Sequence, residues 1–320
     1  MKQIMSDSPT HVKFEVVIPI YKNEESLSEL LLRLEEVSNC LDGTFEAIFV
    51  DDFSPDNSAT FLLNSTKDVS FKISLIRHSR NFGSFAAIRT GLRFSRADFV
   101  GVISADLQEP PMLLLEFFAE LQKGAADIVF GTRVNRQDPV VSRVFSAAYW
   151  RVYRRFINRE IPVGGVDVFA CTNQVTKVIN NLSEGRTSLI GMLFWVGYRR
   201  SFIDYTRSHR KFGKSSWSFR KKLGYMADSV FSFSDLPIRL IRTIGTIGAL
   251  SSLILSTILF LLASKDAINV PGYAPLMIVI LFSSSANLLA LGILGSYIWR
   301  SFELAQSRPI SVVRKDEPTE

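Results

Sequence analysis

Residues 99–111 read FVGVISADLQEPP, and this pattern indicates the fold of the first half of the chain. A mainly apolar run at 99–103 ends in Ser104, Ala105 and Asp106, after which two prolines stop a strand and can open a helix. In an open α/β sheet, ligands bind beyond the carboxyl ends of the strands. Asp106 there, with Gln108 two residues later, can hold a hard cation through oxygen ligands. A solvated turn is the alternative interpretation of this stretch alone.

Strand and helix patterns alternate on both sides of this stretch. Strands are predicted at 14–20, 45–50, 73–76, 99–103 and 127–130, with helices from 24 onward and at 85–94. Such alternation predicts a mostly parallel sheet with right-handed crossovers. Polar residues then gather at one edge of the sheet: Tyr21, Glu24, Asp51, Asp52, Arg80, Asp106, Gln108 and Arg133.

The sequence does not support two other classes of protein, namely dinucleotide-binding or P-loop proteins and phospho-acceptor receiver domains. The chain has neither GxGxxG nor GxxxxGK[ST], which excludes the usual dinucleotide and P-loop signatures. An acidic pair such as Asp51–Asp52 also occurs in phospho-acceptor receiver domains. That class would require a short single domain and a lone lysine near the fifth strand, and neither is evident.

The composition points to a membrane before it points to nucleic acid. The 320 residues carry 37 Lys+Arg against 31 Asp+Glu, and the mean hydropathy of +0.17 is high for a soluble enzyme. We therefore expect no nucleic-acid partner. Cys40 and Cys171 have no CxxC spacing and are predicted to be buried thiols in a reducing compartment.

Two apolar stretches near the end of the chain, 243–263 and 274–299, contain no charged residue. Twenty helical residues at 1.5 Å each span about 30 Å, the thickness of a hydrocarbon core. Basic residues flank the pair, which puts both ends in the cytoplasm by the positive-inside rule. A buried soluble hairpin is the alternative.

A basic, aromatic segment precedes these stretches. Residues 199–222 hold nine Lys/Arg against one acid, Asp204, and include Trp217 and Phe219. This composition is typical of a segment at an anionic headgroup surface. Its charges serve either purely electrostatic attachment or, more specifically, binding of a lipid phosphate.

Five motifs together resemble one known family. They are VVIPIYKNEE (16–25), VDDFSPDNS (50–58), RNFG (80–83), SADLQEPP (104–111) and GTR (131–133). Their order and spacing are similar to the family 2 glycosyltransferases of the GT-A fold, and most of all to the polyprenyl-phosphate sugar synthases. This group includes dolichyl-phosphate mannose synthase and bactoprenol glucosyltransferase. The resemblance runs from about residue 16 to residue 299.

The resemblance implies a donor site and a metal site. Asp106 and Gln108 would bind Mg²⁺ or Mn²⁺ on the diphosphate, and Arg133 would face phosphate. The family often has Asp-Ala-Asp where this chain has Ser104-Ala105-Asp106, so one carboxylate is missing. The alternatives are helix capping for Asp51 and Asp52 and a surface ion pair for Arg133. The residues implied for the nucleotide sugar are Pro19, Tyr21, Glu24, Asp51 and Asp52, with Arg80 and Ser104 as further substrate-binding candidates.

The resemblance also implies an acceptor site. Asp167 aligns with an aspartate that the family places at the acceptor, and with Asp106 it forms the predicted catalytic pair. A phosphomonoester is already largely anionic at neutral pH, so Asp167 acts either as a base or by orienting the acceptor. A turn carboxylate after Gly164–Gly165 is the alternative. Arg207, Arg210 and Lys214 are predicted to grip the lipid phosphate, with Lys214 standing in for a family lysine replaced here by Ser216.

Together these features predict an α/β GT-A catalytic domain at 1–200, an amphipathic interface segment at 201–240, two transmembrane helices within 241–300 and a tail at 301–320. The expected reaction is inverting transfer of a hexose from a nucleotide sugar to polyprenyl (undecaprenyl) phosphate. UDP-glucose is the first candidate donor, followed by other UDP-hexoses and GDP-mannose. A non-catalytic membrane scaffold of the same fold is the alternative function.

The expected location is the cytoplasmic face of a bacterial inner membrane. The expected partners are the nucleotide sugar, the lipid acceptor, a second copy of the chain, and in addition a flippase and a downstream membrane glycosyltransferase.

Overall fold

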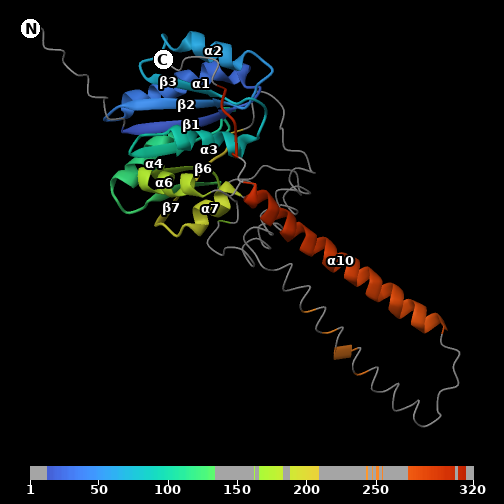
Figure 1. The fold of residues 1–320 in the computed structure, drawn as a ribbon. Helices are drawn as coiled ribbons and strands as arrows, with labels where there is room; N and C mark the ends of the chain where they lie inside the picture. Colours follow the sequence, from blue (N-terminus) through green and yellow to red (C-terminus); the bar gives the residue numbers. More distant parts are fainter. Residues whose placement is uncertain are drawn as a thin grey trace, which may run out of the picture. The chain divides into compact units, whose positions relative to one another are not determined.

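The computed structural model describes residues 13–133, 162, 166–182, 188–208, 273–306 and 309–314, together with positions 243, 247, 250, 251 and 254. The chain divides into two compact units. One comprises Met1–Met226 together with Pro309–Glu320, and the other comprises Ala227–Arg308. Figure 1 shows the elements of each unit.

The first unit is built on a seven-stranded sheet of order β3-β2-β1-β4-β6-β5-β7. Neighbouring strands are parallel except where β6 pairs with β4 and β5. The strands are β1 (Phe14–Ile20), β2 (Phe45–Asp51), β3 (Lys72–Arg77), β4 (Phe99–Val102), β5 (Ile128–Arg133), β6 (Val166–Thr172) and β7 (Arg200–Tyr205).

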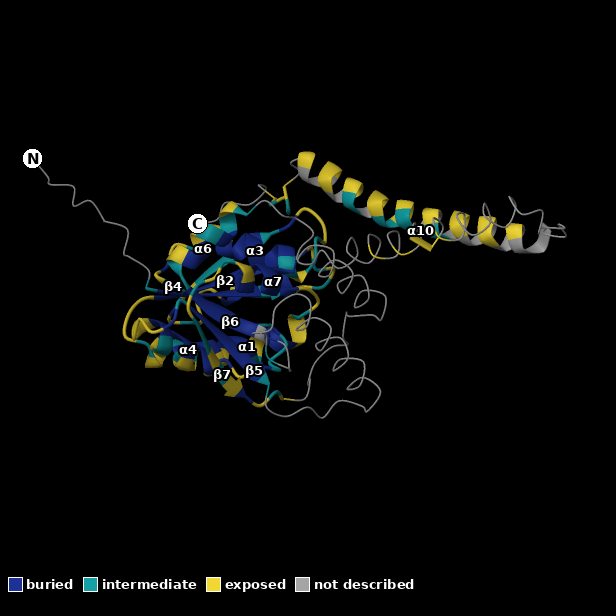
Figure 2. Cartoon of the chain, turned by 90° about the horizontal axis from the view of Figure 1, so that it is seen from below, coloured by how far each residue is buried: buried dark blue, intermediate teal, exposed yellow. Residues whose placement is uncertain are grey.

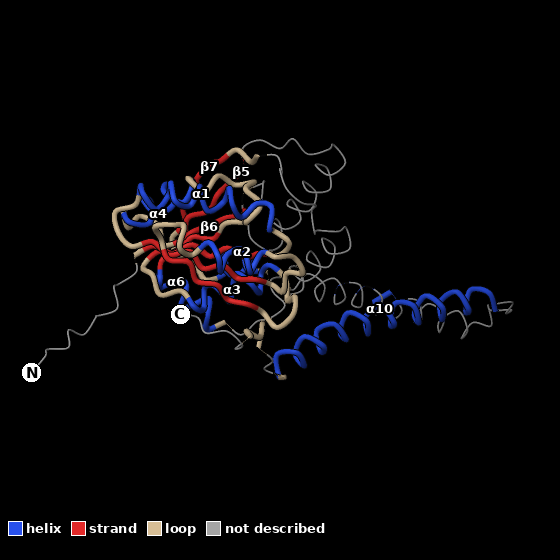
Figure 3. The backbone as a smooth tube through the Cα atoms, turned by 90° about the horizontal axis from the view of Figure 1, so that it is seen from above, coloured by secondary structure: helices blue, strands red, loops and turns tan. Residues whose placement is uncertain are grey.

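Helices cover both faces of this sheet (Figures 2 and 3). On one face, α1 and α4 pack against Phe14, Val16 and Ile18 of β1. On the other face α3 approaches so closely that a Cβ on Gly91 would lie 2.3 Å from Val17. The helices of this unit are α1 (Glu24–Cys40), α2 (Ser58–Ser65), α3 (Ser84–Phe94), α4 (Leu113–Gln122), α6 (Asn173–Asn181) and α7 (Leu189–Trp195).

The local sequence explains these elements. Helix α1 buries Leu27, Leu30, Leu34 and Val37 at helical spacing, and two glutamates occupy its first turn, where the helix dipole favours negative charge. The central strands β1 and β2 are almost wholly buried, as a sheet covered on both faces requires. The prediction of a mostly parallel α/β sheet is therefore confirmed.

The sheet contains two strands that the sequence patterns did not predict. β6 runs antiparallel and inserts between β4 and β5, so β5 does not pair with β4 directly. β7 then pairs with β5 in parallel, and it ends at Tyr205. The strands that were predicted agree with the structure to within a few residues at their ends.

The second unit contains α10 (Tyr273–Ala305), a helix of 33 residues. Among the described residues, no helix meets the combined length and hydropathy needed to cross a membrane. The predicted span at 274–299 lies within α10, and most of the one at 243–263 lies outside the described residues. The hairpin stays a prediction.

The prediction of two buried thiols is wrong for one of them. Cys171 is buried in β6, whereas Cys40 is exposed. Cys40 is the last residue of α1 and follows the exposed Arg33 and Glu36 at helical spacing, so its side chain is on the solvent face of the helix.

Candidate active site at the carboxyl edge of the sheet

The predicted polar residues do meet at one edge of the sheet. β1, β2 and β4 all end there, and the pairs Ile20–Asp51 and Arg133–Tyr205 are in register across neighbouring strands. β6 begins at this edge because it is antiparallel, and Val166 pairs with Thr132 of β5. The backbone of Asp167 therefore lies at the same edge, although its side chain is outside the described part of the chain.

Backbone strain is concentrated here. Among the described residues, the non-glycine positions with positive φ are Lys22 (59°), Phe53 (60°) and Leu107 (57°). Each lies a few residues beyond the end of β1, β2 or β4. Strained conformations of this kind cluster at functional sites, because they aim side chains that a regular turn would not.

The loops after β1 and β2 are joined by hydrogen bonds. Asn57 N donates to Glu24 Oε2 at 3.0 Å, and Glu24 N donates to Asp56 Oδ2 at 3.2 Å. Lys22 N likewise donates to Ser54 Oγ at 3.1 Å. The carboxylate of Glu24 thus fixes one loop to the other, while Tyr21 beside it stays exposed at 38%.

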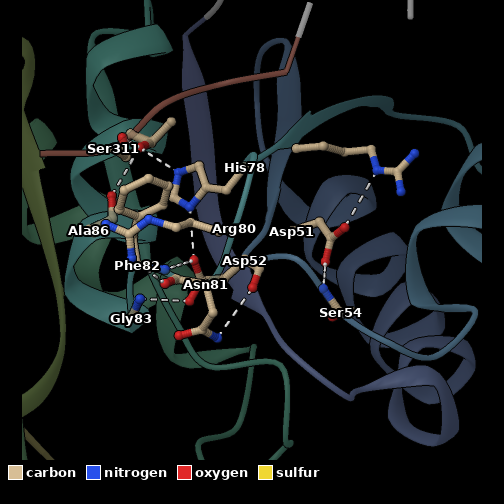
Figure 4. Close-up of polar contacts among 12 residues, drawn as sticks. Asp51, Asp52, Ser54, His78, Arg80, Asn81, Phe82, Gly83, Ala86 and Ser311 are labelled. Atoms are coloured by element: carbon tan, nitrogen blue, oxygen red, sulfur yellow. Dashed lines mark hydrogen bonds and ion pairs between the residues drawn. The ribbon is translucent and has the colours of Figure 1, made fainter. Parts of the chain in front are cut away.

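Asp51 and Asp52 are both buried, with different partners (Figure 4). Asp51 accepts from Ser54 N at 2.9 Å and forms an ion pair with Arg77, whose Nε is 3.5 Å away. Asp52 accepts from Phe82 N and Gly83 N, each at 2.7 Å, one bond to each carboxylate oxygen. The carboxylate of Asp52 therefore holds the loop that contains the RNFG motif.

That loop leads directly into α3. Gly83 has φ = 95°, a conformation that favours glycine, and its carbonyl accepts the first helical hydrogen bond, from Ala87 N at 3.1 Å. The Arg80 guanidinium lies over the Phe82 ring, 4.1 Å from its centre. Arg80 itself is exposed.

Ser104 lies between two carboxylates in the motif SADLQEPP (104–111), which follows β4 and is called the strand-end motif below. Its hydroxyl contacts Asp106 Oδ1 at 2.7 Å and also contacts Glu109 Oε2. Glu109 is buried, and this burial raises the pKa of its carboxyl above the ordinary value against the opposing effect of the Ser104 hydrogen bond. Glu109 thus supplies a second acidic group beside Asp106, which the sequence motif lacks at position 104.

Arg207 brings positive charge to this motif from the segment after β7. Its Nη2 donates to Gln108 Oε1 at 2.6 Å, and its Nε lies 3.4 Å from Glu109 Oε1. Ser208 N also donates to the Gln108 carbonyl at 2.8 Å. Arg133 and the buried Tyr205 complete the cluster, and burial raises the pKa of the Tyr205 phenol.

The residues present fit a divalent cation that has few protein ligands. Asp106, Ser104 and Gln108 offer the oxygen ligands that Mg²⁺ and Mn²⁺ prefer. No group of three or more His, Cys, Asp or Glu suited to a metal occurs within the described residues. Mg²⁺ commonly takes one or two carboxylates and completes its shell with phosphates and water, which matches this donor set.

Two of the predicted site residues, Arg210 and Lys214, lie outside the described residues. Pro19 lies within β1, one residue before the end of this strand. Of the three residues predicted to grip the lipid phosphate, Arg207 is the one whose side chain lies in the described part of the chain, and it contacts Gln108 and Glu109.

The sequence analysis missed other residues of the site. Glu109 could have been found as an acid directly before two prolines at a strand end. No local sequence pattern marks His78, Thr90 or Ser311 as site residues. Their side chains nevertheless form a series of hydrogen bonds that ends at Asp52.

The strand order and the polar residues at the carboxyl edge define an α/β fold with a candidate ligand site where the strands end. The family model for Glycosyl transferase family 2 matches residues 15–215. The chain belongs to this family, and it is a glycosyltransferase.

Relatives match along almost the whole chain. An uncharacterised glycosyltransferase of Synechocystis is 34% identical over 303 residues, covering 94% of this chain and 95% of the relative. The undecaprenyl-phosphate 4-deoxy-4-formamido-L-arabinose transferase of Photorhabdus laumondii is 30% identical over 306 residues, covering 95% and 94%. Among solved structures, glucosyl-3-phosphoglycerate synthase of Mycobacterium tuberculosis aligns over 69% of this chain and 78% of its own, at 18% identity and a TM-score of 0.46.

Proposed function

We propose that this chain transfers a hexose from a nucleotide sugar, UDP-glucose first, to polyprenyl phosphate with inversion at the anomeric carbon. The observation that carries the proposal is the match over almost the whole chain to relatives named as undecaprenyl-phosphate sugar transferases. Such a match includes the basic segment and the apolar stretches as well as the catalytic domain.

The reaction forms one bond and breaks another at the same carbon. An oxygen of the acceptor phosphate attacks the anomeric carbon, and the bond from that carbon to the nucleoside diphosphate breaks. The products are a polyprenyl-phosphate sugar and a nucleoside diphosphate. Catalysis in such a site depends on positioning the two substrates and on stabilising the charge that the leaving group acquires.

In this proposal, donor residues occupy the edge near β1 to β4. Tyr21, Asp51 and the loop held by Asp52 form the wall against which the base and ribose bind, with Arg80 near phosphate. Asp106 would hold Mg²⁺ or Mn²⁺ together with the donor diphosphate, assisted by Gln108 and Ser104. The cation would supply neutralising charge for the leaving group.

Acceptor residues occupy the side near β5 to β7. Arg207 contacts Gln108 and Glu109, so the segment that follows β7 places positive charge at the SADLQEPP motif (104–111), where the donor diphosphate would bind. Arg133, at the end of β5, adds a second guanidinium on this side. Arg210 and Lys214 would extend the binding of the lipid phosphate, and Asp167 would orient the acceptor or accept a proton.

Polyprenyl phosphate is a membrane lipid, so we further propose that residues 1–200 form a cytoplasmic catalytic domain, 201–240 an interface segment and 241–300 a membrane hairpin of the bacterial inner membrane. Reporter fusions test this topology. Fusions at residue 235 and at the C-terminus should both report the cytoplasm, and a tag near Asn269 should report the outside. A C-terminal reporter found outside would contradict the hairpin.

A donor screen tests the reaction itself. Membranes that contain the chain should release UDP from UDP-glucose and form a glycolipid only when polyprenyl phosphate is added. UDP-hexoses and GDP-mannose serve as competing donors, and the variant Asp106→Asn serves as the inactive control. Glycolipid from a different donor would correct the choice of sugar. Absence of product from every donor would favour the non-catalytic scaffold.

A further inference from the structure

The segment that follows α10 returns to the catalytic unit. Residues 309–314, here called the C-terminal strap, belong to the same compact unit as the sheet. Ser79 N donates to the Val312 carbonyl at 2.9 Å, and Arg314 N donates to the Arg77 carbonyl at 2.8 Å. Val313 forms an antiparallel bridge with His78 between these two bonds. The strap therefore pairs with the chain immediately before the loop at 80–83.

Side chains continue this contact into the site (Figure 4). Ser311 Oγ lies 2.6 Å from Thr90 Oγ1, which lies 2.8 Å from His78 Nε2. His78 Nδ1 lies 2.9 Å from Asp52 Oδ1, and the same carboxylate holds Phe82 N and Gly83 N. An unbroken series of hydrogen bonds thus joins the strap to the RNFG loop.

The chemistry of these groups determines which of them donate and which accept along the series. An ionised carboxylate only accepts, so the hydrogen on the Asp52 side of the His78 ring is on Nδ1. The Thr90 hydroxyl has one hydrogen for three partners, since it also contacts the Ala86 carbonyl at 2.9 Å. When the Ser311 hydroxyl donates to Thr90 Oγ1, the single hydrogen of Thr90 stays available for His78 Nε2 or the Ala86 carbonyl. His78 is fully buried, so water cannot replace a lost partner at its ring.

We propose that the C-terminal strap positions the donor-binding loop, with Ser311 acting through Thr90 and His78 on Asp52. Ser311, Thr90 and His78 are positioning residues, since their hydrogen bonds lead to the Asp52 carboxylate and they act through it. The inference rests on the donor site of the proposed function.

Three variants test the series. Ser311→Ala removes the outer hydroxyl, Thr90→Val removes the central hydroxyl at similar volume, and Arg314→Pro removes one backbone donor of the strap. Val312→Ala is the matched control, because its side chain is exposed and only its carbonyl pairs. Each full-length variant is assayed for the KM of UDP-glucose, the KM of polyprenyl phosphate, UDP binding by calorimetry, and hydrogen–deuterium exchange of peptides covering 80–90.

Each of the three variants should raise the donor KM and weaken UDP binding by about three- to tenfold, the effect of one lost hydrogen bond. The acceptor KM should stay at the parental value, and exchange at 80–90 should become faster. Ser311→Thr should restore the parental values. Because the residues act in series, the double variant Ser311→Ala/Thr90→Val should cost less than the sum of its parts.

Other results would overturn the inference. These are unchanged exchange at 80–90 in the three variants, equal increases in the KM of donor and acceptor, or an effect of Val312→Ala as large as that of Ser311→Ala. The exchange measurement needs no substrate. Failure of the proposed reaction would therefore leave the test of the strap intact, and the two failures can be told apart.

Discussion

Asp52→Asn is the substitution whose effect the structure defines most sharply. The Asp52 carboxylate accepts Phe82 N on one oxygen and Gly83 N on the other, both at 2.7 Å. An asparagine keeps the shape of the side chain but turns one oxygen into an NH₂ group. Whichever oxygen is replaced, a backbone N–H then faces another N–H.

The cost follows from this geometry. A buried donor left without an acceptor costs about 1–3 kcal/mol, and hydrogen bonds to an ionised acceptor contribute about 1.5–3 kcal/mol. The remaining bonds of residue 52 also lose the charge of the carboxylate, including the one from His78 Nδ1. We therefore expect Asp52→Asn to lower the free energy of unfolding by about 2–4 kcal/mol.

Urea unfolding of the purified chain in detergent, followed by circular dichroism, measures this change. Asp68→Asn is the control, because Asp68 is exposed and the same charge is removed; it should shift the free energy of unfolding by no more than about 0.5 kcal/mol. The donor KM should rise in Asp52→Asn as the loop at 80–83 loosens. An unfolding free energy for Asp52→Asn equal to that of the control would refute the role given to this carboxylate.

Three further predictions follow from other parts of the structure. Asp106→Asn should lower turnover by more than about a hundredfold and weaken Mg²⁺ binding to the UDP complex in calorimetry, and full activity of this variant or of the parent in EDTA would contradict the metal site. Burial raises the pKa of Glu15 above its ordinary value of 4.5, so the folded chain binds this proton more tightly and loses stability as the pH rises from that value through the raised pKa. Glu15→Gln should therefore gain stability relative to the parent between acid and neutral pH in unfolding experiments, whereas a pH-independent difference would be inconsistent with this. Burial also raises the pKa of Cys171 to about 12, so only about one in ten thousand of these thiols is a thiolate at pH 8. Alkylation at pH 8, followed by mass spectrometry, should therefore label the exposed Cys40 and spare Cys171. Equal labelling rates would contradict the burial of Cys171.

Much of the candidate site could be predicted because parallel strands end at a common edge. Each of the first strands is an apolar run that stops at polar residues, so the sequence predicts a common edge for Tyr21, Asp51 and Asp106. The structure brings these positions together. It also shows that the carboxylates of Glu24 and Asp52 are engaged with neighbouring loops, a detail that residue type alone does not reveal.

Local sequence is enough to predict the alternation of strands and helices, the strand-end motifs and the family, because these depend on residues close together along the chain. The antiparallel insertion of β6 is visible only in the folded structure, since an apolar run does not encode the direction of its strand. The folded structure also links Glu109 to Asp106 through Ser104, and it brings Arg207 into contact with Gln108 and Glu109. It also joined Ser311 to Thr90 across 221 positions, a contact that no local pattern encodes because its partners meet only once the chain has folded.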